Sequence, residues 1–254
     1  MKISKLIISL SVILITSIAS AQETTIRNIL IVTSNQHTYG DTDLNAANHF
    51  EEIVVAYDIF IKAGLKVDFV SPKGGAIPIG YIKTSDSIQK QYLYDEIFMN
   101  KLENTLTPSQ ASQTNYSAIY FSGGGAAMFG VPENEQIQRI TKQIFIRGGT
   151  VSAVCHGTAG ITKLINTNGR YLFEDKRITG YPDAFERKNA AYYKTFPFSI
   201  EQAVKEKGGI FQFSEQGWDG FYITDGRLIT GQDPTATSAV AEKVVTQISI
   251  DNHE

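Results

Sequence analysis

The stretch FEEIVVAYDIFIKAGLKVDFV, residues 50–70, contains a helix directly followed by a strand. Its first part has apolar residues at helical spacing and ends at Gly64, a residue type that commonly terminates helices. The apolar run at 65–70 predicts a strand, and IRNILIVT at 26–33 predicts another strand ahead of the helix. Strand, helix and strand in this order form a βαβ unit, so the sequence predicts a parallel sheet.

The same alternation continues along the chain, interrupted over residues 76–115 by an expected insertion or lid with one short helix near 92–102. The other predicted elements are strands at 117–121 and 150–154, helices at 133–147, 159–164 and 235–248, edge strands at 177–180 and 209–213, and a hairpin over 221–230 around Asp225-Gly226. This pattern predicts an α/β fold: one domain, residues 22–254, with a doubly wound, mostly parallel sheet and helices on both faces. Ligands of such sheets bind beyond the carboxyl ends of the strands.

Composition excludes several classes of protein. Hydrophobic residues make up 42% of the chain and charged residues 19%, which excludes intrinsic disorder. The 23 Lys and Arg against 26 Asp and Glu form no basic block, so neither a nucleic-acid partner nor a polybasic membrane contact is expected. One Cys and four His exclude a disulfide framework and a Cys-rich zinc site.

The N-terminus has the organisation of a secretory signal peptide. Two lysines in the first five residues precede an apolar run at 6–15, and the small residues Ala-Ser-Ala follow at 19–21. The run is too short for a transmembrane span, which needs about 20 apolar residues. We therefore expect a signal peptide over residues 1–21, cleavage after Ala21, and a periplasmic or secreted protein without a membrane anchor.

The single cysteine lies in VSAVCHG, residues 151–157, between a predicted strand and a predicted helix. Small residues two positions to either side, Ala153 and Gly157, are typical of a nucleophile elbow, where a sharp turn exposes the nucleophile above the sheet. The N-terminus of the following helix would lower the pKa of the Cys155 thiol, and His156 would take part in proton transfer. The alternative is a small buried cysteine at the end of a strand.

A triple glycine, residues 123–125, follows another predicted strand. Met128 stands where a dinucleotide-binding motif has its last glycine, so that motif is absent. The backbone N–H groups at Gly124 and Gly125 are instead candidates to bind substrate or an oxyanion, the alternative being a turn that needs positive φ.

Other polar and aromatic residues have less specific interpretations. His37 and His49 lie in or beside an Asn-rich loop and are expected on the surface or at a pocket rim. They lack a third ligand, so no metal site is expected. Trp218 with Tyr222 is interpreted as structural packing.

Together, AVCHG, FSGGG, FEEIVVAYDIFIKAGLKVDFVSPKGG and WDGFYITDGRLITGQDP resemble the DJ-1/PfpI superfamily of class I glutamine amidotransferase-like proteins. The resemblance is greatest to the heat-shock chaperone/glyoxalase III branch and covers residues 27–248. It implies a flavodoxin-like fold.

The resemblance also implies site residues. The nucleophile of the family falls on Cys155 and its partner on His156. The acid that approaches the sulfur falls on Glu52, rather than on its neighbour Glu51, and the oxyanion donors fall on the backbone of Gly124 and His156.

A third acid, which orients the histidine, follows from the pattern YPDAFE at 181–186. The resemblance places this acid at Glu186, with Asp183 as the alternative. Two positions depart from the family pattern: Thr158 replaces a usual proline, and Gly125 replaces a usual His or Asn, which removes a side-chain contact to substrate.

The resulting hypothesis is an enzyme of the glyoxalase III type that converts small reactive carbonyls, methylglyoxal to lactate, without a cofactor. A deglycase or stress-protein role fits the same chemistry, and a homodimer is expected. A holdase chaperone, a cysteine peptidase or amidase, and a redox sensor are the alternatives.

Overall fold

The computed structural model describes residues 28–112 and 114–251, so the predicted signal peptide lies outside the described residues. Its centre is a six-stranded sheet in the order β3-β1-β5-β6-β10-β9, parallel except for β9. The strands are β1 Asn28–Val32, β3 Lys66–Val70, β5 Ala118–Phe121, β6 Thr150–Val154, β9 Tyr222–Asp225 and β10 Leu228–Gly231. The predicted parallel sheet is confirmed.

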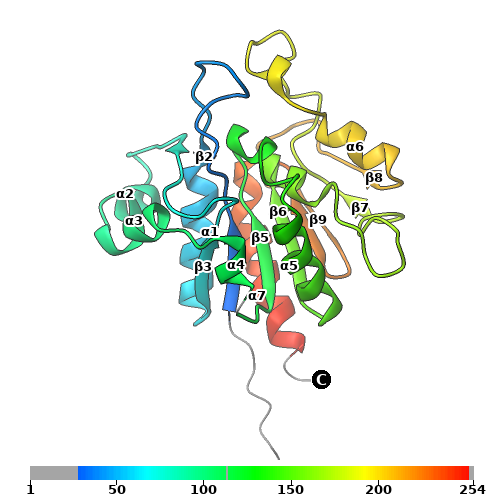
Figure 1. Ribbon diagram of the computed structural model, residues 1–254, viewed down its shortest axis with the longest axis horizontal. Helices are drawn as coiled ribbons and strands as arrows, with labels where there is room; N and C mark the ends of the chain where they lie inside the picture. Colours follow the sequence, from blue (N-terminus) through cyan, green and yellow to red (C-terminus); the bar gives the residue numbers. More distant parts are fainter. Residues whose placement is uncertain (1–27, 113, 252–254) are drawn as a thin grey trace, which may run out of the picture.

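Both faces of the sheet are buried, because successive strand residues point to opposite sides. In β1, Ile29 and Ile31 belong to one hydrophobic cluster and Leu30 and Val32 to the other. Helices α1 (Phe50–Lys62) and α7 (Thr237–Asp251) cover the first face, and α5 (Glu135–Ile146) covers the second (Figure 1). The predicted doubly wound arrangement is confirmed.

The predicted helix that follows Cys155 is wrong, and the two predicted edge strands form but lie outside the central sheet. The expected helix at 159–164 is a 3-10 helix, η2 (Cys155–Ile161). It contains Gly157 and Gly160, which are poor α-helix formers, and its backbone packs tightly against the end of β5. The expected edge strands are β7 (Arg177–Ile178) and β8 (Ile210–Phe211), which pair with each other in a separate sheet.

The insertion at 76–115 is part of the core rather than a lid. It contains β4 (Ile79–Gly80), which pairs with β2 (Asn48–His49), and three helices, α2 (Ser87–Leu93), α3 (Glu96–Glu103) and α4 (Pro108–Ala111). The single predicted helix is divided because the Asp95 carboxylate accepts hydrogen bonds from the N–H groups that begin α3. Tyr92, Phe98 and Leu102 are buried in the same cluster as α1, so the segment widens that side of the core.

The carboxyl ends of the parallel strands carry the remaining segments. The 33–47 loop (blue) and the chain around α6 (Ile200–Glu206, yellow) lie at this end of the sheet (Figure 1). Three further 3-10 helices are η1 (Gly125–Met128), η3 (Tyr193–Thr195) and η4 (Pro234–Ala236).

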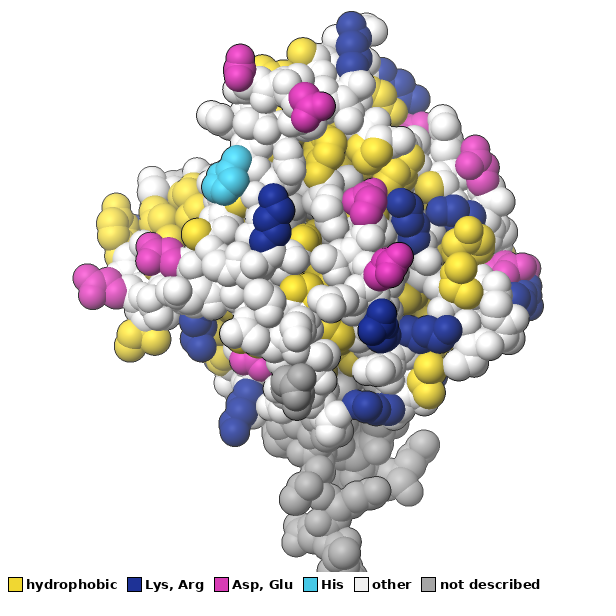
Figure 2. Space-filling model, viewed as in Figure 1, with side chains coloured by type: hydrophobic (Ala, Val, Ile, Leu, Met, Phe, Trp, Pro, Cys, Tyr) yellow, Lys and Arg dark blue, Asp and Glu magenta, His cyan; other side chains and the backbone are white. Residues whose placement is uncertain are grey.

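The surface has mixed charge. Lys and Arg side chains are interspersed with Asp and Glu on the face drawn in Figure 2. None of the helices within residues 28–112 and 114–251 is long and apolar enough to cross a membrane.

Candidate active site

Cys155 stands at the turn from β6 into η2, with φ of 58°. A left-handed backbone at a residue other than glycine costs about 1–3 kcal/mol, which the surrounding fold must offset. The thiol is 3% exposed, and the backbone N–H groups of His156 and Gly124 interact with it. The strained turn therefore holds the sulfur against two N–H donors.

Glu52, in the first turn of α1, is fully buried beside the thiol. Its Oε2 accepts a hydrogen bond of 2.5 Å from the N–H of Gly123, and its backbone carbonyl accepts one from the Tyr120 hydroxyl. A Cβ at position 123 would lie 2.9 Å from Glu52 Oε2 and 2.8 Å from the backbone nitrogen of His156. Glycine is therefore required there, because the carboxylate and the elbow approach the backbone so closely.

The buried carboxyl and thiol disfavour each other's ionisation. Burial raises the pKa of Glu52 from its usual 4.5 to about 8, although the Gly123 N–H and the Cys155 thiol lower it. Burial and the Glu52 carboxylate also raise the pKa of the Cys155 thiol well above its usual value, although the two N–H donors lower it. The expected lowered pKa is wrong: a short 3-10 turn replaces the predicted helix, and the thiol is desolvated beside an acid.

His156 links the thiol to a second acid. Its Nδ1 lies 3.4 Å from Cys155 Sγ, and its Nε2 lies 2.8 Å from Glu186 Oε1. The imidazole stacks on Tyr181 with ring centroids 4.5 Å apart, and Phe196 packs edge-on against it. The structure thus brings Cys155, His156 and Glu186 into one hydrogen-bonded series with the imidazole ring fixed in orientation.

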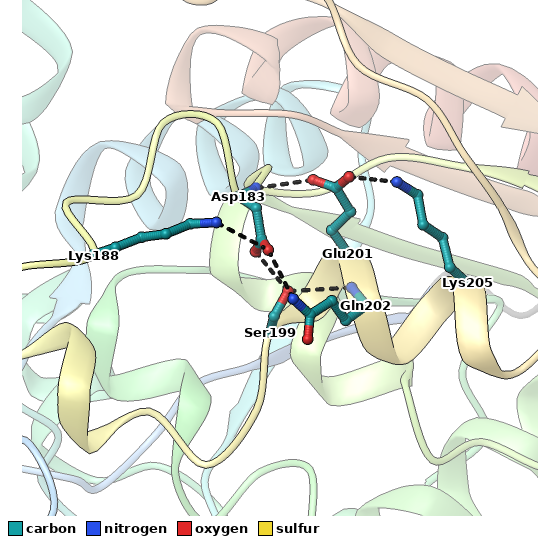
Figure 3. A network of polar contacts seen from close by, with 6 residues as sticks. All are labelled: Asp183, Lys188, Ser199, Glu201, Gln202 and Lys205. Atoms are coloured by element: carbon teal, nitrogen blue, oxygen red, sulfur yellow. Dashed lines mark hydrogen bonds and ion pairs between the residues drawn. The ribbon is translucent and has the colours of Figure 1, made fainter.

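Asp183, the alternative third acid, has other partners, whereas Glu186 is the acid bonded to His156. It belongs to a polar network at the start of α6, whose other members are Lys188, Ser199, Glu201, Gln202 and Lys205 (Figure 3). The Ser199 hydroxyl donates a 2.5 Å hydrogen bond to Asp183 Oδ1, and the Asp183 N–H donates to Glu201. This network attaches the loop to α6 and so positions Glu186.

The two departures from the family pattern are accommodated by neighbouring side chains. The place of a side chain at Gly125 is filled by the ring and hydroxyl of Tyr39, which hydrogen-bonds to the Tyr81 hydroxyl at 3.2 Å. The buried Thr158 hydroxyl donates to the carbonyl of Thr179. Tyr39 therefore supplies a polar group where Gly125 cannot.

A cavity of about 500 Å³ opens above the sulfur and is lined by Cys155, His156, Gly124 and Gly125. Among the described residues, seven of the fourteen that line it are Tyr, Phe or Trp. Of residues 76–112 and 114–115, only Tyr81 contributes to the lining. The cavity is thus a largely aromatic chamber with a thiol and an imidazole in its wall.

His49 also lines this cavity. Its ring stacks on Tyr81 at 4.7 Å, and burial lowers its pKa to about 3, so it is a neutral imidazole at physiological pH. Within the part of the chain that the structure describes, no three His, Cys, Asp or Glu side chains are grouped closely enough to hold a metal ion.

Sequence reasoning missed the aromatic wall. Trp218 was expected to pack with Tyr222, but it lines the cavity and contacts Tyr181 and Phe185 instead. Four of the wall's seven rings come from residues 181–196, but Tyr39, Tyr81 and Trp218 come from three other segments, so no local pattern marks the whole wall.

Comparison with known proteins places these features in a family. The sequence profile of the DJ-1/PfpI family matches residues 45–247. A glutathione-independent glyoxalase of Schizosaccharomyces pombe is 28% identical, over 87% of this chain and 98% of its own. A glutathione-independent glyoxalase of Saccharomyces cerevisiae is 29% identical, over 85% and 95%. Glyoxalase 3 of Candida albicans is 26% identical, over 87% and 97%.

Solved structures agree in fold. The 24 kDa Rapid Encystment Protein of Francisella tularensis has a TM-score of 0.81 at 26% identity, covering 87% of this chain and 99% of that one. The crystal structure of glyoxalase III from Candida albicans has a TM-score of 0.78 at 24% identity, covering 88% and 98%. The second likeness shows the shared fold alone.

Proposed function

Since the chain belongs to the DJ-1/PfpI family, we propose that it is a glyoxalase III-type enzyme, which converts a small α-oxoaldehyde such as methylglyoxal to its 2-hydroxy acid. Relatives named glutathione-independent glyoxalases, alike over most of the chain, support this proposal. We propose Cys155 as nucleophile, His156 with Glu186 as its proton acceptor, and Glu52 as the base that acts on carbon.

One observation carries the proposal: the thiol lies beside two separate proton-accepting systems. The first system is His156 paired with Glu186, and the second is the buried carboxyl of Glu52. A hydrolase needs one acid–base group beside its nucleophile. Isomerising an oxoaldehyde needs a second one, because a proton must also leave one carbon and reach the next.

The first step is addition of the thiol to the aldehyde. Because the pKa of Cys155 is raised, the thiol is protonated at rest, and His156 Nδ1 accepts its proton as sulfur bonds to carbon. Glu186 stabilises the imidazolium that forms. The backbone N–H groups of Gly124 and His156 stabilise the developing oxyanion, and the His156 imidazolium then gives its proton to this oxygen, which leaves a hemithioacetal and a neutral imidazole.

The second step moves a proton between the two carbons of the adduct. Ionised Glu52 removes the proton from the carbon bonded to sulfur, while the hydroxyl proton of the adduct passes to the neighbouring ketone oxygen, giving an enediolate. Protonated Glu52 then returns its proton to that neighbouring carbon, and the oxygen next to sulfur becomes the thioester carbonyl. The product is a 2-hydroxyacyl thioester on Cys155. Water cleaves the thioester, releasing lactate and the free thiol, so the net reaction is methylglyoxal plus water to lactate.

The site is less suited to a redox sensor. Sensor cysteines combine a low pKa with exposure, whereas this thiol is buried and its pKa is raised.

The decisive experiment follows lactate formation from methylglyoxal without glutathione or added metal. Cys155→Ala should abolish it, and Glu52→Gln should lower kcat by at least about a hundredfold, because the amide preserves shape but cannot act as a base. Glu51→Gln is the matched control, since Glu51 lies one residue away, pairs with Lys83 and should leave kcat unchanged. Wild-type lactate no greater than that of Cys155→Ala would refute the proposal.

The pH profile tests the role of Glu52 separately. With a pKa of about 8, the base form is the minority at neutral pH. We expect kcat to rise about tenfold per pH unit below pH 7 and to level off above pH 8, because activity follows the ionised fraction. A kcat that falls as pH rises over this range would assign Glu52 the role of an acid instead.

We further propose that the protein is exported to the periplasm or secreted, on the basis of the N-terminal pattern. N-terminal sequencing of protein isolated from its host should begin at Gln22. An intact Met1 would contradict export with cleavage.

A further inference from the structure

Backbone strain is concentrated around the cavity. Among the described residues other than glycine, four have positive φ: Tyr81, Cys155, Asp175 and Trp218. All but Asp175 line the cavity. Cys155 is accounted for by its role as nucleophile, but the proposed chemistry gives no reason for strain at two aromatic residues. Strain of this kind persists where the surrounding structure maintains it, commonly at functional sites.

Trp218 is held in place by its backbone while its ring remains exposed. Its φ is 48°, and its N–H donates a 2.8 Å hydrogen bond to the buried Asp233 carboxylate. The preceding part of the loop is fixed by Gln232, whose side-chain amide bonds both the N–H and the carbonyl of Ser214. Trp218 is nevertheless 57% exposed, so the fold presents this residue to solvent instead of burying it.

Tyr81 is presented in a similar way from a distant segment. Its φ is 58°, its ring stacks on His49, and its hydroxyl bonds to that of Tyr39. The residue is still 47% exposed. Two exposed aromatic rings are thus fixed in the wall of one cavity by separate sets of contacts.

The cavity is larger than methylglyoxal requires. A three-carbon dicarbonyl displaces about 150 Å³, taking each of its five non-hydrogen atoms as roughly one water of about 30 Å³. The cavity measures about 500 Å³, so most of it stays vacant when such a substrate occupies the thiol. The vacant part is lined mainly by aromatic rings, which bind planar apolar groups by stacked or edge-on contact.

We propose that the preferred substrates of this site are α-oxoaldehydes that carry an aryl group, with the ring bound by Trp218 and Tyr81. The inference rests on the proposed function, since it places the aldehyde carbon at Cys155. The bond changes are those described for methylglyoxal: phenylglyoxal and water give mandelate, and the aryl group takes no part in them.

The kinetic test compares phenylglyoxal with methylglyoxal as substrates of the purified protein. In Trp218→Ala and in Tyr81→Ala, the ratio of kcat/KM for phenylglyoxal to kcat/KM for methylglyoxal should fall about tenfold relative to wild type. Tyr94→Ala is the control, because Tyr94 is 72% exposed and does not line the cavity. Equal losses for both substrates, or no loss for either, would overturn the inference.

A binding test separates this inference from the proposed function. Trp218 is the only tryptophan in the chain, so intrinsic indole fluorescence reports on this cavity alone. In Cys155→Ala, 2-hydroxyacetophenone should quench it at a concentration at least about tenfold below that required of hydroxyacetone, which has the same ketone without the ring. Selective quenching in Cys155→Ala, with no lactate formed by the wild-type protein, would refute the glyoxalase function and retain the aryl site. Lactate formation by the wild-type protein, without selective quenching in Cys155→Ala, would refute the aryl site alone.

Discussion

Replacing Glu52 with glutamine should make the protein more stable at neutral pH while making it inactive. Glu52 has a pKa of about 8 when folded against its usual 4.5, so the unfolded chain ionises at a pH where the native carboxyl keeps its proton. The free energy of unfolding that the Glu52 carboxyl contributes is fully present below pH 4.5. It is lost progressively as the pH rises from 4.5 to 8. Each pH unit in this window corresponds to about 1.4 kcal/mol, so wild type loses about 3 kcal/mol by pH 7.

Glutamine avoids this loss, because it is neutral in both states and its Oε1 can still accept the Gly123 N–H. Urea unfolding at pH 7 should show Glu52→Gln more stable than wild type by about 3 kcal/mol, a midpoint shift of about 1 M. The difference should disappear near pH 4.5. The Glu51 carboxylate lies at a half-buried surface position, so the free energy of unfolding of Glu51→Gln should differ from that of wild type by less than about 0.5 kcal/mol at both pH values. A destabilised Glu52→Gln with no pH dependence would mean that the native carboxyl is ionised, and the raised pKa of Glu52 would be refuted.

Three further outcomes follow from the site. Iodoacetamide should alkylate native Cys155 slowly at pH 7, and a midpoint below the usual thiol value of about 8.5 would contradict the raised pKa. Glu186→Gln should lower kcat about tenfold to a hundredfold with little change in KM, because the imidazolium of His156 loses its counter-charge; unchanged kcat would remove Glu186 from the mechanism. Gly125→Ala should destabilise the protein by about 1–3 kcal/mol through overlap with Tyr39, and a Tyr39→Ala background should relieve most of that cost; equal costs in both backgrounds would contradict the overlap.

The sheet, and the place of the cysteine on it, were predictable from sequence because they depend on local patterns. The apolar run before Cys155 and the small residues around it determine a strand and a turn within a few positions. The same holds for the hairpin, where Gly226 takes the positive φ that its turn needs. Strand order then places the ends of β5 and β6 side by side, which brings Gly124 to the sulfur.

The electrostatics and the aromatic wall were not predictable in this way. The pKa of the thiol depends on how deeply it is buried and on how near Glu52 lies, and both are properties of the packed core. Trp218 and Tyr81 are separated by more than a hundred residues and meet only at the cavity. Each carries a backbone conformation that its own residue type disfavours, so local propensity points away from the observed structure.

The position of β6 in the sheet determines when the site can form. β6 lies between β5, which precedes it, and β10, from which residues 155–227 separate it. While that intervening chain is being synthesised, β6 has one neighbour and an open edge of unpaired backbone groups. Cys155 also packs in the cluster that contains Val240 and Val244 of α7, which is made later still. A nascent chain therefore carries Cys155 before α7, which helps to bury it, and before Glu186, which pairs with His156, have been made, so the complete site forms only after α7 is synthesised.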